Sequence, residues 1–387
     1  MTKGKRLWIL LMGTCLLISG CAKTGKTNDN IQQDEVTQSA EHAALETEVD
    51  IEPEIVSEES EIEPEPVITT LTLSAAGDCT LGVTQQHGYE NSFHEYYDNY
   101  GETYFFENFK EIFEKDDLTL VNLECVLTDP NKREEKAFNL KGKPKYVGIM
   151  TSSSIEAVSL GNNHTRDYGE ESLVDTQETL EQAGILYAYN DRVSYFTSDE
   201  GIVVAMVSAS ILASTRSYET YLLEGVAEAV SADADIIVAC CHWGIEGDYY
   251  PTEHQQQVGH KLIDAGADLV IGHHPHVLQG IEEYNGKIIC YSLGNFCFGG
   301  NRNPAEKNTI VYQQTFTFAD GILQPEINAG IVPSRVSGHS GYNDFQPMVA
   351  TGEQGESIIN KMNQYSAPYS NVMFDASGTL VINESKQ

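Results

Sequence analysis

Runs of apolar residues with strand character alternate along this chain with stretches of helical periodicity. Five of these runs are rich in Val, Ile, Leu and Ala, and they cover residues 67–78, 117–124, 157–164, 233–242 and 266–276. Because strands that alternate with helices are typical of α/β proteins, the pattern predicts an α/β fold.

Two helices are predicted most clearly between the apolar runs. The first covers residues 169–184 and ends at Gly184; its apolar face carries Leu173, Thr176, Leu180 and Ala183. The second covers residues 251–266, with Pro251 at the first helical position and Gly266 at its end.

The last hundred residues predict more strands and one further helix. Residues 286–300 read as a strand followed by a polar turn, in which Asn295 either lines a cleft or serves the turn. Residues 308–336 alternate apolar and polar positions around Asp320-Gly321, a pair typical of a type I′ hairpin turn. A late helix (353–367) and a closing strand pair (372–382) complete the chain.

Composition limits the classes of partner. The chain has 387 residues, 41% of them hydrophobic, which is enough for one large domain or two ordinary ones. Its formal net charge is -35 at pH 7. Such a charge argues against nucleic acid or an anionic membrane face as a partner.

The N-terminus predicts a secreted, anchored protein. Lys3, Lys5 and Arg6 precede an apolar run (7–18) that is short for a membrane-spanning helix, as in a secretory signal peptide. Residues 17–21, LISGC, resemble the lipobox of bacterial lipoproteins, in which the cysteine, here Cys21, becomes the lipidated N-terminus. The alternative is an uncleaved anchor helix, and both place the protein outside the cytoplasm and on the cell membrane.

A linker is predicted between the signal peptide (1–21) and the folded domain (67–387). Residues 22–66 hold fourteen Asp and Glu against two Lys, so they cannot bury a core and should form an extended, disordered spacer. Binding a cation or a basic partner is an alternative role. Gly20–Thr27 matches a phosphate-binding loop by its letters, but it has neither the preceding strand nor the following helix, so we reject that interpretation.

Five of the predicted strands end in residues that can bind metal. In open α/β sheets, ligand sites gather at the carboxyl ends of the strands. Each of these residues alone has an ordinary structural explanation, but together they supply carboxylate, amide and imidazole ligands, which suit one or two Mn, Fe or Zn ions. The residues are Asp78, Glu124, Asn163 with His164, His242, and His274 with His276.

Six motifs occur in an order that resembles the CapA-type poly-γ-glutamate capsule synthesis proteins, a branch of the calcineurin-like metallophosphoesterases. They are GD (77–78), NLE (122–124), GNNHTRDYG (161–169), CHWGIEG (241–247), GADLVIGHHPHVLQGIE (266–282) and YSLGNF (291–296). The resemblance implies a four-layer α/β/β/α sandwich with two mixed β-sheets. It also implies a secreted or membrane-bound protein that assembles or exports poly-γ-glutamate, with the polymer or its synthesis complex as partner.

The resemblance also implies roles for single residues. Asp78, Asn163, His242, His274 and His276 match metal ligands. Glu124 stands where the family places a carboxylate that bridges two metals, and His164 matches the histidine that faces the leaving oxygen. His273 matches a variable neighbour, whose side chain should point to the other face of an extended segment. A simpler alternative for His164 is a hydrogen bond to Asp167 that closes the local turn.

One position departs from the family pattern. These phosphoesterases usually begin with Asp-x-His, whereas this chain has Asp78-Cys79-Thr80. The loss of an imidazole either weakens one metal position or requires a substitute, for which Glu246 and Cys79 are candidates. The six cysteines of the domain form no small-protein disulfide pattern, and most lie on apolar strands.

Two function classes follow from these features. In the first, the domain is a metal-dependent hydrolase or transferase that acts on polyglutamate or a phosphoester at the cell surface. In the second, it is a non-catalytic scaffold of a polymer synthesis complex, with a structural or vestigial metal site. From residue 67 onward there are 44 acidic and 18 basic residues, so a polyanionic polymer would be repelled without bound cations. The charge therefore favours the metal-assisted site.

Overall fold

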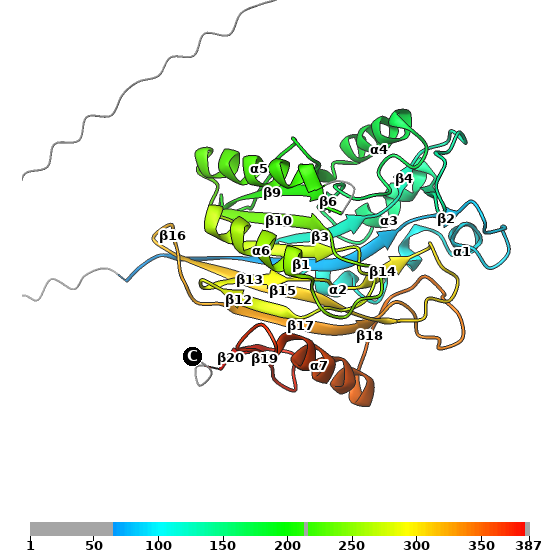
Figure 1. The fold of residues 1–387 in the computed structure, drawn as a ribbon. Helices are drawn as coiled ribbons and strands as arrows, with labels where there is room; N and C mark the ends of the chain where they lie inside the picture. The colour runs from blue at the N-terminus through cyan, green and yellow to red at the C-terminus, as the bar shows by residue number, and fades with distance from the viewer. Residues whose placement is uncertain (1–64, 213–215, 384–387) are drawn as a thin grey trace, which may run out of the picture. The chain divides into compact units, whose positions relative to one another are not determined.

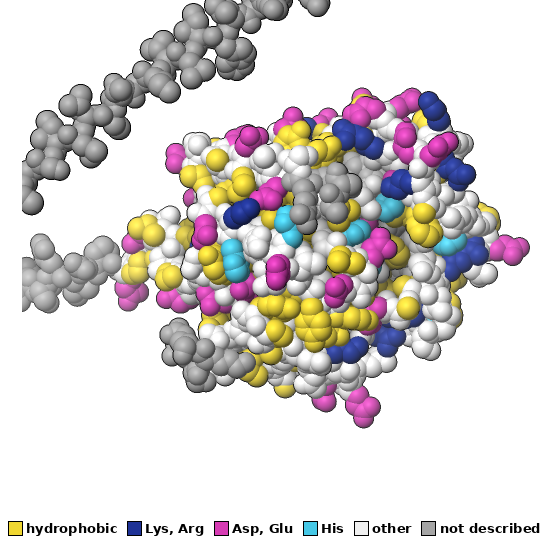
Figure 2. All heavy atoms as spheres, viewed as in Figure 1, with side chains coloured by type: hydrophobic (Ala, Val, Ile, Leu, Met, Phe, Trp, Pro, Cys, Tyr) yellow, Lys and Arg dark blue, Asp and Glu magenta, His cyan; other side chains and the backbone are white. Residues whose placement is uncertain are grey.

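The computed structural model describes residues 65–212 and 216–383, and residues 64–387 belong to one compact unit. The predicted signal peptide, Cys21 and residues 22–64 of the predicted linker lie outside the described part. Within that part, no helix is both long and apolar enough to cross a bilayer. Acidic side chains are spread over the visible face of the molecule (Figure 2).

The first large sheet is mixed, with strands on both sides of β1. Four neighbouring strands, β1, β3, β6 and β7, run parallel, and β15, β17 and β18 continue the sheet in antiparallel order. From edge to edge the strands are β18 (Met348–Val349), β17 (Asn328–Arg335), β15 (Asn308–Ala319), β1 (Ile68–Thr80), β3 (Leu118–Leu123), β6 (Ala157–Ser159) and β7 (Leu186–Ala188). Two further strands join this sheet: β14 (Asn295–Phe298) beside β1 and β16 (Ile322–Leu323) beside β15.

The second large sheet is mixed as well, since its two edge strands run against a parallel centre. In order, its strands are β12 (Ile281–Tyr284), β13 (Lys287–Cys290), β11 (Leu269–His273), β10 (Ile236–His242), β9 (Val203–Ser210) and β8 (Ser194–Thr197). Two small sheets complete the described strands: β2 (Val83–Thr84), β5 (Leu140–Gly142) and β4 (Val126–Leu127), and the pair β19 (Val372–Phe374) and β20 (Leu380–Ile382). The predicted α/β class with two mixed sheets is confirmed.

Helices cover the outer faces of the two sheets (Figure 1). The α-helices are α1 (Phe93–Tyr100), α2 (Lys110–Phe113), α3 (Val147–Thr151), α4 (Glu170–Ala183), α5 (Glu219–Ser231), α6 (Glu253–Ala265) and α7 (Gly352–Ser366). Short 3-10 helices occur at Glu102–Tyr104, Pro144–Tyr146 and Arg216–Tyr218.

Strand alternation explains how these layers are held together. One set of side chains from β1 and β10, such as Leu73 and Val238, meets in a core between the two sheets. The opposite faces pack on helices: β3 and β6 on α1–α4, and β9 and β10 on α5 and α6. Cys240 lies in the core between the sheets and Cys241 in the core under α5 and α6, as expected for adjacent strand residues. All six cysteines of the described part are buried and free, as predicted.

Most of the predicted elements are present, and one helix start is corrected. α4 buries Leu173, Thr176 and Leu180, and Gly184 ends it with φ 75°. α6 ends at Gly266 as predicted, but it begins at Glu253, because Thr252 forms a capping box with Gln255 and Pro251 lies before the cap. The hairpin turn at Asp320-Gly321 has positive φ at both residues, as a type I′ turn requires, and α7 and the β19–β20 pair occupy the predicted places.

Candidate metal centre

Asp78 stands near the end of β1, fully buried, with polar groups around its carboxylate. Asn122 on the neighbouring β3 donates from Nδ2 to Oδ1 at 2.8 Å. His273 Nδ1 lies 3.3 Å from Oδ1, and His276 Nδ1 lies 3.1 Å from Oδ2. Burial opposes ionisation of Asp78, but hydrogen bonds from the two histidines hold its pKa well below the ordinary value. Asp78 is therefore a charged ligand group in the interior.

Gly77 allows β14 to approach β1 at this point. A Cβ at Gly77 would lie 2.0 Å from the carbonyl oxygen of Gly294, which no side chain can accommodate. The close approach permits the Asp78 N–H to donate to that carbonyl at 2.9 Å and brings Asn295 into register beside Asp78. Asn295 also pairs its Oδ1 with His276 Nδ1 at 2.9 Å, so it lines the cleft, the first of its two predicted roles.

Glu124 directly follows β3 and is one of the buried polar groups of the site that lack hydrogen-bond partners. Its side chain is fully buried, and neither carboxylate oxygen has a hydrogen-bond partner among the described residues. Three imidazole nitrogens approach Oε1, at 3.6, 3.7 and 3.9 Å, from His242, His276 and His164 respectively. Burial raises the pKa of Glu124 well above its ordinary value. An unpaired buried carboxylate is costly unless a cation compensates it, so this geometry fits a metal ligand.

Asn163, His242 and His274 form the other side of the cluster. The Asn163 Oδ1 lies 2.9 Å from His242 Nε2, and the rings of His242 and His274 are 4.7 Å apart between centroids. Burial lowers the pKa of His242 well below its ordinary value and lowers that of His274 to about 4, with the positive charge of a neighbouring histidine adding to both effects. Both rings are thus neutral at pH 7, which is the form that binds metal.

The segment from His273 to His276 is not extended, and this corrects one prediction. His274 and His276 have φ values of 95° and 58°, a region that non-glycine residues rarely adopt. His273 ends β11 on the same face as Leu269 and Ile271, so it faces the core between the sheets and Asp78. The turn that follows brings His274 and His276 to the same side, so His273 does not point away from them as predicted. Strained backbone of this kind costs on the order of 1–3 kcal/mol per residue and clusters at functional sites.

The structure therefore brings the six predicted metal-ligand positions together: Asp78, Glu124, His242 and His274 are buried, His276 is partly buried and Asn163 is exposed. Ligand atoms of Glu124, His274 and His276 lie within 4.8 Å of one another, as a bound ion would require. The cluster of carboxylate, imidazole and amide groups is consistent with a metal site.

The position that departs from the family pattern has a structural use of its own. Thr80 is buried, and its hydroxyl donates to the backbone carbonyl of Glu124 at 3.2 Å. Cys79 lies in the core toward α1–α4, where burial raises its thiol pKa to about 12, so it does not substitute for the missing imidazole. Glu246 is exposed at the rim of the adjacent cavity and is not one of the residues whose ligand atoms cluster.

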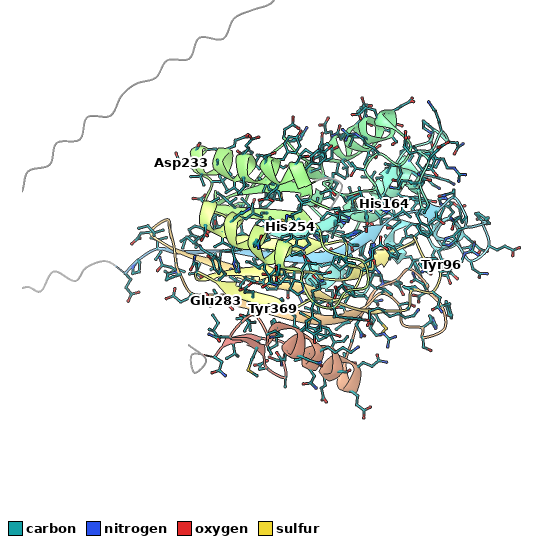
Figure 3. The ribbon with its side chains drawn as sticks, viewed as in Figure 1. Tyr96, His164, Asp233, His254, Glu283 and Tyr369 are labelled. Carbon is teal, nitrogen blue, oxygen red and sulfur yellow. The ribbon has the colours of Figure 1, made fainter. Side chains whose placement is uncertain are left out.

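His164 (labelled in Figure 3) lies in a turn after β6. Its Nδ1 donates to the Asp167 carboxylate at 2.6 Å, and its Nε2 lies 3.9 Å from Glu124 Oε1. Burial lowers the pKa of His164 in spite of Asp167, which raises it. The two alternatives for His164 therefore coexist, because it closes the turn with one nitrogen and faces the cluster with the other.

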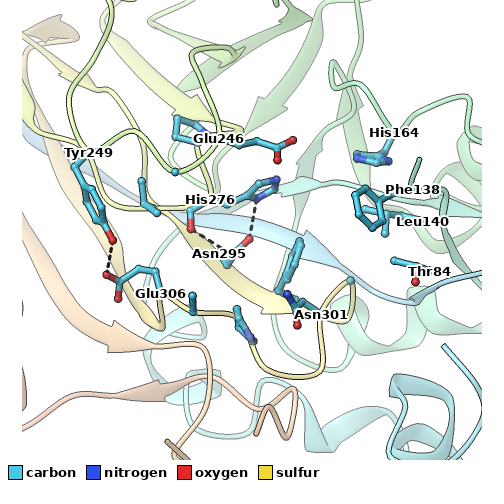
Figure 4. Close-up of a pocket in the computed structure, with 17 residues that line it drawn as sticks. Thr84, Phe138, Leu140, His164, Glu246, Tyr249, His276, Asn295, Asn301 and Glu306 are labelled. Atoms are coloured by element: carbon cyan, nitrogen blue, oxygen red, sulfur yellow. Dashed lines mark hydrogen bonds between the residues drawn. The ribbon is translucent and has the colours of Figure 1, made fainter. Parts of the chain in front are cut away.

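A cavity of about 590 Å³ opens beside the cluster (Figure 4). His164, His276 and Asn295 form its polar side. Phe138 and Phe298 are among the apolar residues on its wall. A cavity of this size holds a small molecule or a short stretch of polymer next to the cluster.

Two residues of the site were missed by reasoning from sequence. Asn122, which orients Asp78, is two positions before Glu124, so strand alternation places both on one face of β3 and supplies the signal. Asp167 was considered only as a turn partner. In the structure it is buried and also accepts from the backbone N–H of Leu140, which lines the cavity. That link joins segments far apart in sequence and gives no sequence signal.

The family model described as "Bacterial capsule synthesis protein PGA_cap" matches residues 72–300, more than half of the chain. The chain belongs to this family. It is 31% identical over 255 residues to the "PGA biosynthesis protein CapA" of Bacillus subtilis (strain 168), an alignment that covers 59% of this chain and 63% of the relative. It is 29% identical over 266 residues to the "Capsule biosynthesis protein CapA" of Bacillus anthracis, covering 62% and 63% respectively.

The chain thus spans a little under two thirds of the length of these two PGA_cap-family relatives. Among solved structures, a hypothetical protein from Thermus thermophilus is similar with a TM-score of 0.42 and 15% identity, covering 68% of this chain and 99% of that one.

Replacing His274 and His276 together with Ala should reduce the metal content of the purified protein. Ligand atoms of the two rings and of the Glu124 carboxylate lie within 4.8 Å of one another, and water replaces an imidazole ligand poorly. Metal per mole of protein, measured by elemental analysis, should fall at least several-fold. Equal metal content in the double variant and in the parent would refute the assignment of both residues.

Proposed function

We propose that this protein is a membrane-anchored, extracytoplasmic component of poly-γ-glutamate capsule synthesis or export that carries a metal-dependent hydrolase or transferase site. The observation that carries the proposal is Glu124, a fully buried carboxylate without a hydrogen-bond partner among three imidazoles at the edge of a cavity. A purely structural residue would not be kept at such a cost without a compensating cation. The two relatives are named for PGA biosynthesis and capsule biosynthesis, and this suggests the polymer.

The proposed centre would hold one or two ions of Mn, Fe or Zn. Glu124, His274 and His276, whose ligand atoms lie within 4.8 Å of one another, would hold the first ion. Asp78, Asn163 and His242 would supply the further ligands. When bound, such an ion supplies Lewis acidity and makes water a better nucleophile at neutral pH. Together with the two packed sheets, this arrangement supports the proposed kinship with four-layer metallophosphoesterases.

The residues of the chain have separate tasks in this proposal. The Asp167 carboxylate holds the proton of neutral His164 on Nδ1, so Nε2 is free to take a proton from a reacting group and to return it to a leaving group. Asn122 fixes the orientation of Asp78. Phe138 and Phe298 cover part of the cavity wall and keep water away from the bound substrate.

The test is metal analysis of the purified protein, followed by incubation of poly-γ-glutamate with the protein and the metal that is found. A shift in the polymer length distribution, abolished by a chelator and restored by the metal, is the expected result. Protein that contains its metal yet leaves polyglutamate and a panel of phosphoesters unchanged would contradict the enzymatic proposal.

A second candidate, a scaffold with a structural metal, is favoured by one observation. The Thr80 hydroxyl donates a hydrogen bond to the backbone carbonyl of Glu124, and Thr80 has no imidazole. The metal position next to Asp78 therefore has one ligand fewer than the usual pattern. A weaker second ion would suit a structural site. Under this candidate the variants that empty the centre lower stability but leave capsule production intact wherever the protein still folds.

The proposed domain organisation is a lipoprotein signal peptide (1–21), an acidic linker (22–66) and a CapA-type domain (67–387). Replacing Cys21 with Ala should release the protein from the membrane fraction, because the lipid is proposed to be its anchor and the apolar run is short for a membrane span. The measurement is an immunoblot of membrane and soluble fractions. Retention of the variant in the membrane fraction would favour the alternative, an uncleaved anchor helix.

A further inference from the structure

Positive charge is concentrated in one segment of this acidic domain. Six of the 18 Lys and Arg residues after residue 66 lie between positions 132 and 145, against two Glu. We call these six the basic strip: Lys132, Arg133, Lys136, Lys141, Lys143 and Lys145. Figure 2 shows dark blue side chains on the side of the molecule that carries α4 and β4 in Figure 1.

One end of the basic strip is fixed to the candidate metal centre. Lys136 donates from Nζ to the backbone carbonyl of Asn163 at 2.8 Å and forms an ion pair with Asp167. Asp167 in turn accepts from the backbone N–H of Leu140 at 2.5 Å, and its own carbonyl accepts from the N–H of Glu134 at 2.9 Å. The turn that carries the strip is therefore held against the turn that carries His164, at the rim of the cavity.

The strip continues away from the rim past Tyr168. The ammonium group of Lys141 lies 4.9 Å from the centre of the Tyr168 ring. The positive charge of Arg133 acts on the same residue, lowering the pKa of Tyr168 against the larger rise that burial causes. Lys141 thus continues the strip beside the Tyr168 ring.

The far end of the strip surrounds His94. Burial lowers the pKa of His94 to about 4, and the positive charges of Lys143, Lys141 and Lys145 add to that effect. Lys145 also lies over the ring of Tyr97, 4.4 Å from its centre. Lys136, Lys141 and Lys145 therefore carry the strip from the turn of His164, past Tyr168, to Tyr97 on α1.

Half of the strip has no internal counter-charge. Within the described residues, the side chains of Lys132, Arg133 and Lys143 form no hydrogen bond and no ion pair within 4 Å. Lys145 has one partner, Asp98, at 3.4 Å on the surface, and such exposed pairs contribute little. These charges are available to an external anion.

We propose that the basic strip binds a carboxylate polymer, poly-γ-glutamate, and guides it into the cavity beside the metal centre. The identity of the polymer rests on the proposed function. Among the described residues that line the cavity there is no Lys or Arg, whereas Glu246 and Glu306 are present. A polyanion therefore needs cations at the rim, and the strip places them in a row, as an extended chain of carboxylates requires.

The experiment measures binding of fluorescent poly-γ-glutamate of about twenty residues to the full chain at low salt. One variant changes Lys132, Arg133 and Lys143 to Gln, three residues without internal partners. The matched control changes Lys110, Lys115 and Lys261 to Gln, which alters the net charge equally at exposed sites on or next to α2 and α6. We expect the strip variant to bind about ten-fold more weakly and the control less than two-fold more weakly, with a smaller salt dependence for the strip variant.

The alternatives are separated by two further measurements. The strip proposal is overturned if the two triple variants bind the polymer equally well or if the parent does not bind it. It is also overturned if the strip variant loses binding to phosphatidylglycerol vesicles but keeps binding to the polymer. If polymer binding depends on the strip while the metal-loaded protein shows no turnover, the strip proposal stands and the proposed enzymatic function fails.

Discussion

Changing Glu124 to Gln should abolish metal binding and leave the metal-free protein at least as stable as the parent. The parent gains about 2.7 kcal/mol from a metal present at 100 times its Kd. The variant should gain no stability from the metal, because the amide of Gln lacks the negative charge of the carboxylate that would bind it. Thermal unfolding with the metal and with a chelator measures both effects, and the parent's melting temperature should rise by roughly 4 °C on metal addition.

The effect of pH on the metal-free proteins has a definite sign. Burial raises the folded-state pKa of Glu124 above its unfolded value, so ionisation of this group opposes folding. The parent therefore loses stability as pH rises through and above the unfolded pKa, and the variant does not. The advantage of Glu124→Gln should be largest near pH 7 and should disappear near pH 4, where the carboxyl is protonated in both states.

Glu282 provides the matched control for this variant. It is buried as well, but its carboxylate has partners: His260 Nε2 at 3.1 Å from each oxygen, and the Tyr291 hydroxyl. Glu282→Gln should lower stability by about 1–3 kcal/mol and leave metal content unchanged. If Glu124→Gln destabilises the metal-free protein as Glu282→Gln does, Glu124 is a structural residue and the metal assignment is wrong.

The α/β class could be predicted because the apolar runs and helical stretches alternate with clear periods. The strand ends were predicted less well: β10 ends at the expected His242, but β11 ends at His273 and β6 at Ser159, before the histidines at 276 and 164 that close their apolar runs. The start of α6 was placed too early. A proline at the first helical position and a proline before the N-cap have the same sequence pattern, and only the Thr252–Gln255 hydrogen bonds distinguish them.

The candidate site was predictable in its members but not in its geometry. The strand-end rule explains why Asp78 and His242 meet, although they are far apart in the chain. The arrival of His273 and His274 in the same cluster was not predictable, since it depends on the positive φ of His274, which strand alternation does not anticipate. The use of Thr80 was equally hidden, because its contact to the backbone of Glu124 depends on the register between β1 and β3.

His164→Ala is the variant that separates the enzyme from the scaffold. Its Nε2 lies 3.9 Å from Glu124 Oε1, at the cavity, while its Nδ1 is held by Asp167. Removing the ring takes away a positioned proton-transfer group but none of the proposed metal ligands. We expect metal content and folding to be kept and turnover on the true substrate to fall by about 10² to 10⁴.

The control is His254→Ala on α6 (labelled in Figure 3), a partly buried histidine that lies 3.6 Å from Glu219. It should leave metal content, turnover and capsule production unchanged. Capsule polymer is then measured in strains that carry the parent, either variant or a deletion. If the deletion strain makes no polymer and the His164→Ala strain makes normal amounts, proton transfer by His164 is not needed and the domain works as a scaffold. If the deletion strain and the His164→Ala strain both make no polymer, and the His164→Ala protein keeps its metal, His164 has a catalytic role. A scaffold does not require the free nitrogen of that ring.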